Sequence, residues 1–340
     1  MRTIEYILFL ILIFPFFTNA QTITGVIIDA KTKQPIETVN VFFDNTTVGT
    51  TTNSKGEFSI TYTDKIRTTL VISYLGYEKQ YFNNYRELTY LSISLEEDLS
   101  LLDEVVINAN DGLTRKQKLR LFRQEFLGQT ANGKSCKILN EDALILRYDK
   151  PKKTLTVSSI EPLIIKNKNL RYNTTFDIID FQILFRYANG KTNEFNVNQV
   201  TYEGTTFYKN IEGSERKKIS KRREKSYLGS TQHFLRALYS GSLKKEGFQF
   251  YYKGMVIPEN KYVRVSEIKN SDFKKVEIIG KIGIVFKGNI KSGIQLFNTD
   301  HFEIDQYGNY SPIQGVMFSG AISEKRVGDL LPFDFELNKK

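Results

Sequence analysis

The 340-residue chain has few of the residues that metal sites, disulfides and many catalytic sites require: one Cys, two His and no Trp. A single Cys cannot form an intramolecular disulfide. It also cannot supply a zinc site built from four Cys, or from two Cys and two His. Any mechanism that needs two neighbouring imidazoles must use both His233 and His301. These shortages exclude several large classes of structural and catalytic site.

The rest of the composition is that of a basic, strand-rich protein that folds. The chain carries 48 Lys and Arg against 38 Asp and Glu, a net charge of +10, with 40% hydrophobic and 25% charged residues. Such a balance is typical neither of a disordered chain nor of an ordinary helical membrane protein. The 19 Tyr and 25 Phe favour β-structure. The length predicts about two domains.

The N-terminus has the pattern of an export signal. Residues 7–17 form an uninterrupted apolar run, preceded by Arg2 and followed by a short polar stretch that ends at Ala20. The run is shorter than the ~20 residues that a membrane-spanning helix needs, and a small residue stands where cleavage would occur. We therefore predict a signal peptide over residues 1–20 and an exported mature protein, with an uncleaved anchor or a buried helix as the alternative. No Cys follows the run, so a lipoprotein anchor is not indicated.

Residues 21–108 read as a series of short strands divided by turn residues. Gly56 ends a polar loop and supplies the positive φ that a tight hairpin needs. Strands are predicted over residues 22–28, 39–43, 46–52, 57–62, 70–74, 77–82 and 91–95. So many short strands in so little chain predict a β-sandwich.

An ordered series of motifs in this segment resembles a known family. The motifs are Gly25-x-x-x-Asp29, Thr32-x-x-Pro35-Ile36, Val39-Asn40-Val41, Gly49-Thr50-Thr51-Thr52-Asn53-x-x-Gly56-x-Phe58, Ser73-Tyr74-Leu75-Gly76-Tyr77 and Leu102-Asp103-Glu104-Val105-Val106. Together they resemble the carboxypeptidase regulatory-like domain found on exported proteins of Bacteroidota. The resemblance implies a seven-stranded Greek-key sandwich of transthyretin-like fold, which serves as an accessory or assembly module. It also implies a Gram-negative cell, with the protein in the periplasm or associated with the outer membrane.

The resemblance to this family does not imply peptidase activity. A zinc carboxypeptidase holds its metal with a closely spaced His and Glu and a distant second His. His233 is followed at the third position by Arg236, and His301 has Glu303 at the second. Neither forms a His-x-x-Glu pair, so we predict no carboxypeptidase activity, no metal and no cofactor.

Residues 109–340 are predicted to form a second, β-rich domain. A polar segment over residues 108–112 marks the boundary, and Thr114 is placed to cap a helix that ends at Gly128. Strand-like runs then recur, and a short helix is predicted after Ser230. The pattern indicates an antiparallel α+β fold, mostly β, with about two helical insertions. The basic side of the first helix, which includes Lys118 and Arg123, is predicted to be solvated, with an anion-facing surface as the alternative.

A phosphate-loop motif also lies in this region. Residues 128–135, from Gly128 to Ser135, match G-x-x-x-x-G-K-S. A nucleotide-binding loop must follow a buried strand and open a helix, so that the helix N-terminus points at the phosphates. Here the motif follows a predicted helix. We therefore predict that the chain binds no nucleotide.

A cationic segment in the middle of the chain is the candidate binding surface. Its seven cations are Arg216, Lys217, Lys218, Lys221, Arg222, Arg223 and Lys225. The alternatives are a solvated helix face, contact with an anionic envelope glycolipid or an acidic partner, and contact with nucleic acid. Sequence-independent nucleic-acid binding combines cations with stacking aromatics, and Tyr227 is the only aromatic nearby. We therefore predict no nucleic-acid partner.

No catalytic signature accompanies these features. The chain lacks Gly-x-Ser-x-Gly, and no nucleophile motif points to either histidine. We predict an exported, non-catalytic envelope protein that binds a partner or takes part in an outer-membrane assembly. Two alternatives stay open: a peptide or glycan hydrolase with its carboxylates scattered over the second domain, and a small outer-membrane β-barrel.

Overall fold

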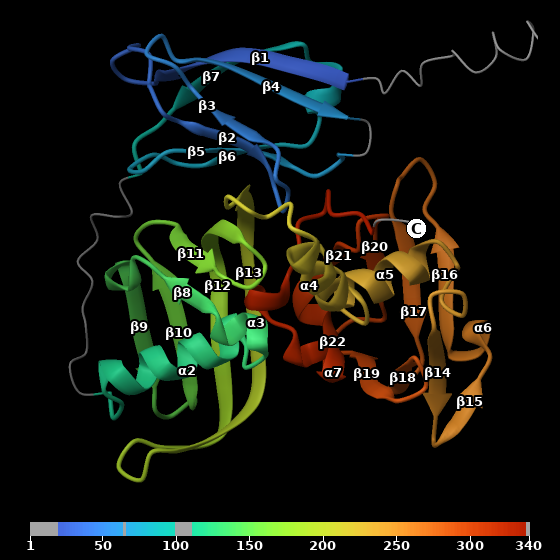
Figure 1. The fold of residues 1–340 in the computed structure, drawn as a ribbon. Helices are drawn as coiled ribbons and strands as arrows, with labels where there is room; N and C mark the ends of the chain where they lie inside the picture. The colour runs from blue at the N-terminus through green and yellow to red at the C-terminus, as the bar shows by residue number, and fades with distance from the viewer. Residues whose placement is uncertain (1–19, 64–65, 99–110, 338–340) are drawn as a thin grey trace, which may run out of the picture. The chain divides into compact units, whose positions relative to one another are not determined.

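The computed structural model describes residues 20–63, 66–98 and 111–337. The predicted signal peptide, apart from Ala20, lies outside the described residues. So do the motif at 102–106 and the predicted boundary at 108. The described residues form two compact units, one from residues 20–44, 48–63 and 66–98 and one from residues 45–47 and 111–337 (Figure 1). Within these ranges no helix is both long and apolar enough to cross a membrane.

The first unit is a β-sandwich of seven strands within the described residues. One sheet has the order β4-β1-β7 and the other β3-β2-β5-β6. The strands are β1 (Ala20–Asp29), β2 (Asn40–Phe43), β3 (Gly49–Thr51), β4 (Glu57–Thr63), β5 (Leu70–Ser73), β6 (Gln80–Phe82) and β7 (Tyr90–Leu95), with a short 3-10 helix η1 (Tyr85–Glu87) before β7. Only β1 and β7 run parallel among the described pairs. The predicted sandwich and its seven strands are confirmed.

Burial in this unit follows the alternation of the sequence. Phe58, Ile60 and Tyr62 are buried along β4 while their neighbours are exposed, because successive side chains of a strand point to opposite faces. Their rings and methyl groups meet Val41 and Phe43 from the facing sheet. Hydrophobic burial between the two sheets therefore fixes the strand register.

Three residues of the quoted motifs meet at the end of β1. Asp29 accepts hydrogen bonds from the backbone N–H of Thr32 at 2.5 Å and from the hydroxyl of Tyr77 at 2.8 Å. These bonds, led by the one from the Thr32 backbone, lower the pKa of Asp29 to about 2. The bond to Asp29 in turn raises the pKa of Tyr77 to about 12. The motif residues therefore close a turn, and their geometry explains why the pattern needs an acid, a hydroxyl and a tyrosine at these positions.

The second unit begins with a helix packed on a sheet. The sheet has the order β8-β11-β12-β10-β9, and β13 also pairs with β12. The elements are α2 (Arg115–Leu127), α3 (Ala131–Lys134), β8 (Cys136–Ile138), η3 (Glu141–Ala143), β9 (Leu144–Asp149), β10 (Thr154–Ser159), β11 (Leu163–Asn167), β12 (Tyr172–Asn189) and β13 (Glu194–Asn210). Thr114 and Gln117 form a capping box at the start of α2, which confirms the predicted helix start. Phe122 and Phe126 stack at 4.7 Å and anchor α2 to the sheet.

Strand β13 runs through a position at which the sequence predicts a break. We expect separate strands before and after Gly204, but β13 is continuous and contains a register shift opposite residues 178–180. A Cβ on Gly204 would lie 2.2 Å from the carbonyl oxygen of Asp177. The bulge is in β12, where Ile179 is the extra residue, and Gly204 lies opposite it, at a close approach of the two backbones and not at the end of a strand.

The rest of the second unit contains two further antiparallel sheets and several helices. One sheet has the order β15-β14-β18-β19-β22 and the other β16-β17-β20-β21. The strands are β14 (Phe248–Tyr252), β15 (Met255–Ile257), β16 (Val263–Glu267), β17 (Lys274–Ile278), β18 (Ile282–Phe286), β19 (Ile290–Leu296), β20 (His301–Ile304), β21 (Tyr310–Ser311) and β22 (Val316–Gly320). The helices are α4 (Lys217–Tyr227), α5 (Thr231–Tyr239), α6 (Glu259–Tyr262), α7 (Ala321–Glu324), η4 (Ile313–Gly315) and η5 (Val327–Asp329). The predicted antiparallel, mainly β fold is confirmed. The predicted helices after Thr114 and Ser230 are α2 and α5, the cationic segment forms α4 between β13 and α5, and the short helices are additional.

Candidate functional site

Helix α4 is oriented by its two large apolar side chains. Ile219 and Tyr227 are buried, and Tyr227 belongs to a cluster with Leu170, Tyr172 and Leu331. Burial of these side chains fixes the rotation of the helix. Lys217, Lys218, Lys221 and Lys225 are therefore exposed, whereas Ser226 is buried.

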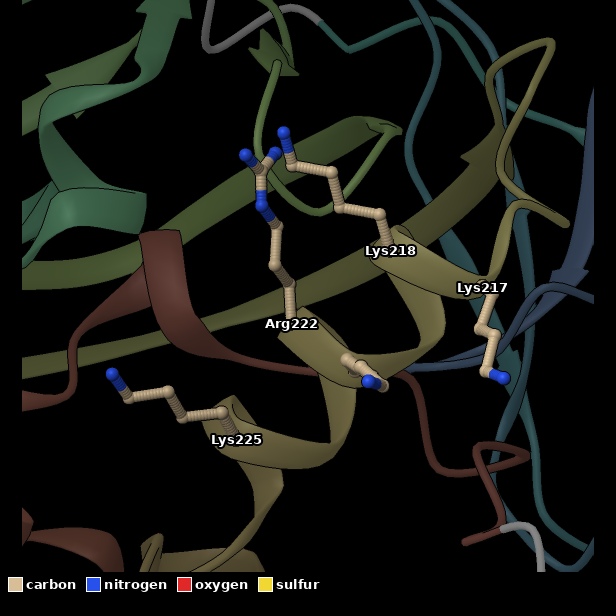
Figure 2. A pocket seen from close by; sticks show the side chains of 5 residues that line it. Lys217, Lys218, Arg222 and Lys225 are labelled. Carbon is tan, nitrogen blue, oxygen red and sulfur yellow. The ribbon is translucent and has the colours of Figure 1, made fainter.

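Five cations of α4 line an open hollow of ≈ 500 Å³ (Figure 2). We call this set the α4 basic surface: Lys217, Lys218, Lys221, Arg222 and Lys225. The four lysines are exposed, and Arg222 is half-buried beside Asn169. Figure 2 shows Lys218 and Arg222 extending to the same side of the helix. Within the described ranges, none of the five forms an ion pair with a carboxylate.

This arrangement costs α4 stability. Lys217 and Lys221, Lys218 and Arg222, and Lys221 and Lys225 are each four residues apart, and like charges at that spacing cost about 0.2–0.5 kcal/mol per pair. The first turn also has cations and no acid, although the helix dipole favours negative charge there. A bound anion would offset both penalties.

Arg223, which the sequence groups with these cations, has a different role. Its guanidinium lies 3.7 Å from the ring centre of Tyr172. Its Nε donates to the carbonyl of Leu170 at 2.9 Å, and Nη2 donates to the side chain of Asn210 at 2.9 Å. Burial lowers the pKa of Arg223. Arg223 therefore attaches α4 to the sheet and is not part of the exposed surface, whereas exposed Arg216 is the N-cap residue, just outside the hollow.

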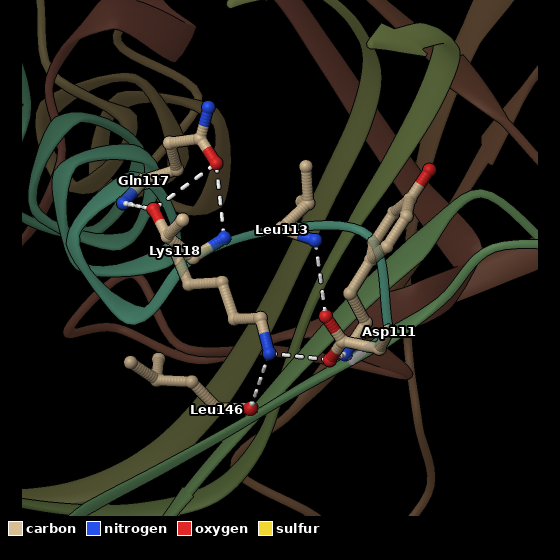
Figure 3. A network of polar contacts seen from close by, with 7 residues as sticks. Asp111, Leu113, Gln117, Lys118 and Leu146 are labelled. Atoms are coloured by element: carbon tan, nitrogen blue, oxygen red, sulfur yellow. Dashed lines mark hydrogen bonds and ion pairs between the residues drawn. The ribbon is translucent and has the colours of Figure 1, made fainter. Parts of the chain in front are cut away.

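Most cations on the basic side of α2 form ion pairs or hydrogen bonds with other residues of the second unit. Lys118 was expected in solvent, but it is 5% exposed and forms an ion pair with Asp111 (Figure 3). Its Nζ also donates to the carbonyl of Leu146 at 3.3 Å. Arg123 forms an ion pair with Glu141. The expectation of a solvated basic face is therefore wrong for Lys118, and α2 offers a weaker anion surface than α4.

The phosphate-loop motif binds a carboxylate of the chain itself. It follows helix α2, as expected, and Thr130 caps the four-residue helix α3. The hydroxyl of Thr130 donates to Asp329 Oδ2 at 2.6 Å, and the Asn132 amide donates to Asp329 Oδ1 at 2.8 Å. Ser226 donates to the backbone carbonyl of Asp329 at 2.8 Å. The polar groups of the motif thus connect distant segments of the unit, and no local sequence signal points to Asp329.

The two histidines lie in different surroundings. His233 is 2% exposed and packs against the rings of Tyr227 and Phe248. Its Nδ1 accepts from the backbone N–H of Gly229, so the proton is on Nε2, which faces Glu246 at 3.2 Å. Burial lowers the pKa of His233. His301 is more exposed and pairs with its neighbour Asp300. In the part of the chain that the structure describes, no three His, Cys, Asp or Glu side chains gather in a group able to hold a metal ion.

Cys136 should react slowly in the folded protein. Burial, followed by the nearby Asp329 carboxylate, raises the pKa of the thiol from 9.0 to about 12. Only the thiolate is nucleophilic, so its reactive fraction at pH 8 falls about a thousandfold. We expect iodoacetamide to label Cys136 slowly in the native protein and rapidly in urea, as followed by intact mass. Rapid labelling of the folded protein would contradict a buried, protonated thiol.

Comparison with known proteins identifies the first unit. Residues 23–107 match the family model of the CarboxypepD_reg-like domain, which confirms the resemblance stated from the sequence. That match covers the first unit. No curated protein matches the chain.

Two solved structures show weak similarity. A 9R-lipoxygenase from Cyanothece PCC8801 is 8% identical, with 65% of this chain and 48% of that chain covered and a TM-score of 0.18. The present chain thus spans about half the length of that enzyme. A putative membrane-associated protein of unknown function from Bacteroides fragilis NCTC 9343 is 12% identical, with coverages of 88% and 95% and a TM-score of 0.17. Similarities of this size carry no information about function.

Proposed function

We propose that the chain is an exported, non-catalytic envelope protein of a Gram-negative bacterium, and that its second unit binds anionic lipid headgroups through the α4 basic surface. The regulatory-like sandwich would act as an accessory module, in the periplasm or at the outer membrane. The observation that carries the proposal is a set of five neighbouring cations that line an open hollow and have no ion-pair partner among the described residues.

The chemistry of the surface favours headgroups over an acidic protein. Four of the five cations are Lys, a compact charge on a mobile stem, whereas recognition of carboxylates on a protein more often uses the planar fork of Arg. Clusters of four to eight cations on a helix are typical of contact with anionic lipid, at about 1 kcal/mol per cation near the surface. The headgroups would be those of a phosphorylated glycolipid or an anionic phospholipid.

Sedimentation with vesicles tests this proposal. The protein should bind vesicles of phosphatidylglycerol and phosphatidylcholine, and fail to bind phosphatidylcholine alone. Replacing Lys217, Lys221 and Lys225 by Gln should weaken binding by about 3 kcal/mol, roughly a hundredfold, at low salt. Binding of the unchanged protein should also fall as the salt concentration rises, because the Debye length shortens to about 8 Å at physiological ionic strength.

A matched control separates local charge from net charge. Lys137, Lys166 and Lys191 are exposed, and replacing them by Gln removes the same three charges from other elements. This control should bind almost as well as the unchanged protein. Vesicles that contain lipid A distinguish a glycolipid from a phospholipid. Equal losses in both triple variants, or no binding to any anionic vesicle, would show the proposal to be wrong and leave an acidic protein as the partner.

A further inference from the structure

The hairpin formed by β14 and β15 exposes apolar side chains on both of its faces. Met255 is 68% exposed and its neighbour Val256 is 60% exposed, the values of largely solvated side chains. Consecutive residues of a strand point to opposite sides, so the two side chains emerge from opposite faces of the hairpin. Strand β15 is also the edge strand of its sheet (Figure 1). The end of this hairpin therefore presents apolar surface in two directions.

An aromatic pair with two cations adjoins the turn of the hairpin. The rings of Tyr252 and Tyr262 stack at 4.5 Å. Lys253 Nζ lies 5.5 Å from the centre of the first ring, and Lys261 Nζ lies 5.4 Å from the centre of the second. Met255 is the register partner of Tyr252. Apolar, aromatic and cationic groups thus lie side by side at the tip of the hairpin.

A third exposed apolar side chain adjoins this aromatic pair. Ile279 is 54% exposed, and its backbone N–H donates to the carbonyl of Tyr262 at 2.9 Å. It directly follows Ile278, the register partner of Val263, and so lies beside Tyr262. The exposed apolar surface therefore extends from β15 to the end of β17.

The turn of the hairpin places a cation at its tip. Lys253 and Gly254 form a two-residue connection with φ of 48° and 82°. Such turns need positive φ at both central positions and prefer Asn-Gly, so Lys adopts this conformation at some cost in stability. Lys253 thereby places an ammonium group beside the apolar side chains, whereas Asn at this position would place a neutral amide there.

We infer that the tip of the β14–β15 hairpin inserts into the interfacial layer of a lipid bilayer, with Met255 and Val256 among the acyl chains and the lysines at the phosphates. The inference rests on the proposed function, for which it supplies a second point of contact. A protein partner would cover one face of the hairpin, whereas a fluid lipid layer surrounds both. Tyr rings and Lys side chains occupy the boundary between water and lipid in interfacial proteins, because each has an apolar body and a polar end.

A single introduced Trp can report insertion, because the chain contains none of its own. We expect the fluorescence of Met255→Trp to shift to shorter wavelength on addition of phosphatidylglycerol vesicles and to be quenched by brominated lipid chains. Leu139→Trp is the matched control: Leu139 is 53% exposed and lies just after β8. Its emission should stay unchanged. Replacing Met255 and Val256 by Asp should weaken binding about tenfold or more, since charged side chains resist transfer into an apolar layer.

The outcomes separate this inference from the proposed function. Vesicle binding in which the emission of the Met255→Trp protein does not shift overturns the inference and leaves the α4 contact standing. A shift that persists when Lys217, Lys221 and Lys225 are replaced supports the inference and removes α4 from the proposal. Absence of vesicle binding in every form contradicts both. Because Met255 and Val256 are exposed, their substitution should leave the circular dichroism spectrum unchanged, which checks that each variant is folded.

Discussion

Replacing Lys118 by Met should lower the free energy of unfolding of the second unit by about 3–5 kcal/mol, the cost of breaking a buried ion pair by removing one partner. The Asp111 side chain is 9% exposed and would lose its counter-ion. It would retain only the backbone N–H groups of Leu113 and Tyr148, at 3.2 and 3.1 Å. Urea unfolding followed by circular dichroism measures the change, with the transitions of the two units compared.

Two further variants show whether the effect comes from the buried charge. Asp111→Asn combined with Lys118→Met removes both charges and should recover part of the lost stability, because a buried pair exchanged for neutral groups is often close to neutral in cost. Arg123→Ala breaks an exposed pair, in which the Arg123 side chain is 48% exposed, and should cost at most about 1 kcal/mol. If Lys118→Met unfolded at the same urea concentration as the unchanged protein, the assigned role of the pair would be wrong.

Replacing Gly133 by Ala should destabilise the second unit by about 1–3 kcal/mol or more, because the new methyl group would overpack a backbone contact. A Cβ at this position would lie 2.4 Å from the carbonyl oxygen of Gly128 and 2.5 Å from that of Leu127. Gly328 approaches the same place, since its own added Cβ would lie 2.5 Å from the Cα of Gly133. Backbone atoms cannot turn aside as a flexible side chain can. Thermal and urea unfolding measure the loss.

The neighbouring residue discriminates between packing and phosphate binding. In a nucleotide-binding loop the Lys after this Gly contacts the phosphates, so Lys134→Ala would abolish ligand binding. Here Lys134 is exposed, and its substitution should change the free energy of unfolding by no more than about 0.5 kcal/mol. A thermal shift on addition of Mg-ATP that disappeared in Lys134→Ala would reverse the interpretation of this motif.

Much of the fold could be predicted because local signals agree with one another. In the first unit, alternation of apolar residues, polar turns and the ordered motifs all indicate the same seven strands. In the second, Thr114 and Ser230 are residues that cap helices well, and both do so in the structure. The sequence predicts a break in the long strand β13, because a Gly within a strand pattern looks the same locally whether it ends the strand or faces a bulge in the partner strand, as Gly204 does. Distinguishing the two requires the partner strand.

The candidate site was only partly predictable. The sequence locates the cations of α4, because these residues are close together along the chain. It does not separate Arg223 from the others, since the ring of Tyr172 that Arg223 covers is brought there by the sheet. The same limit applies to Lys118. Its position on a basic helix face predicts an exposed side chain, and only the structure shows that Asp111 lies beside it. The β14–β15 tip has no charge or motif signal and emerges only from the exposure of its side chains.

The attachment of Asp329 also constrains the order in which the second unit can fold. The hydrogen bond between Thr130 and Asp329 joins residues 199 positions apart, and the one from Asn132 joins residues 197 apart. Contacts of such long range form late, because a large loop must close before they contribute. The polar groups of helix α3 and its cap can therefore form these hydrogen bonds only after residues 327–329 have been synthesised. The second unit therefore cannot reach its native state one segment at a time, because pairs of residues 197 and 199 positions apart must first come together.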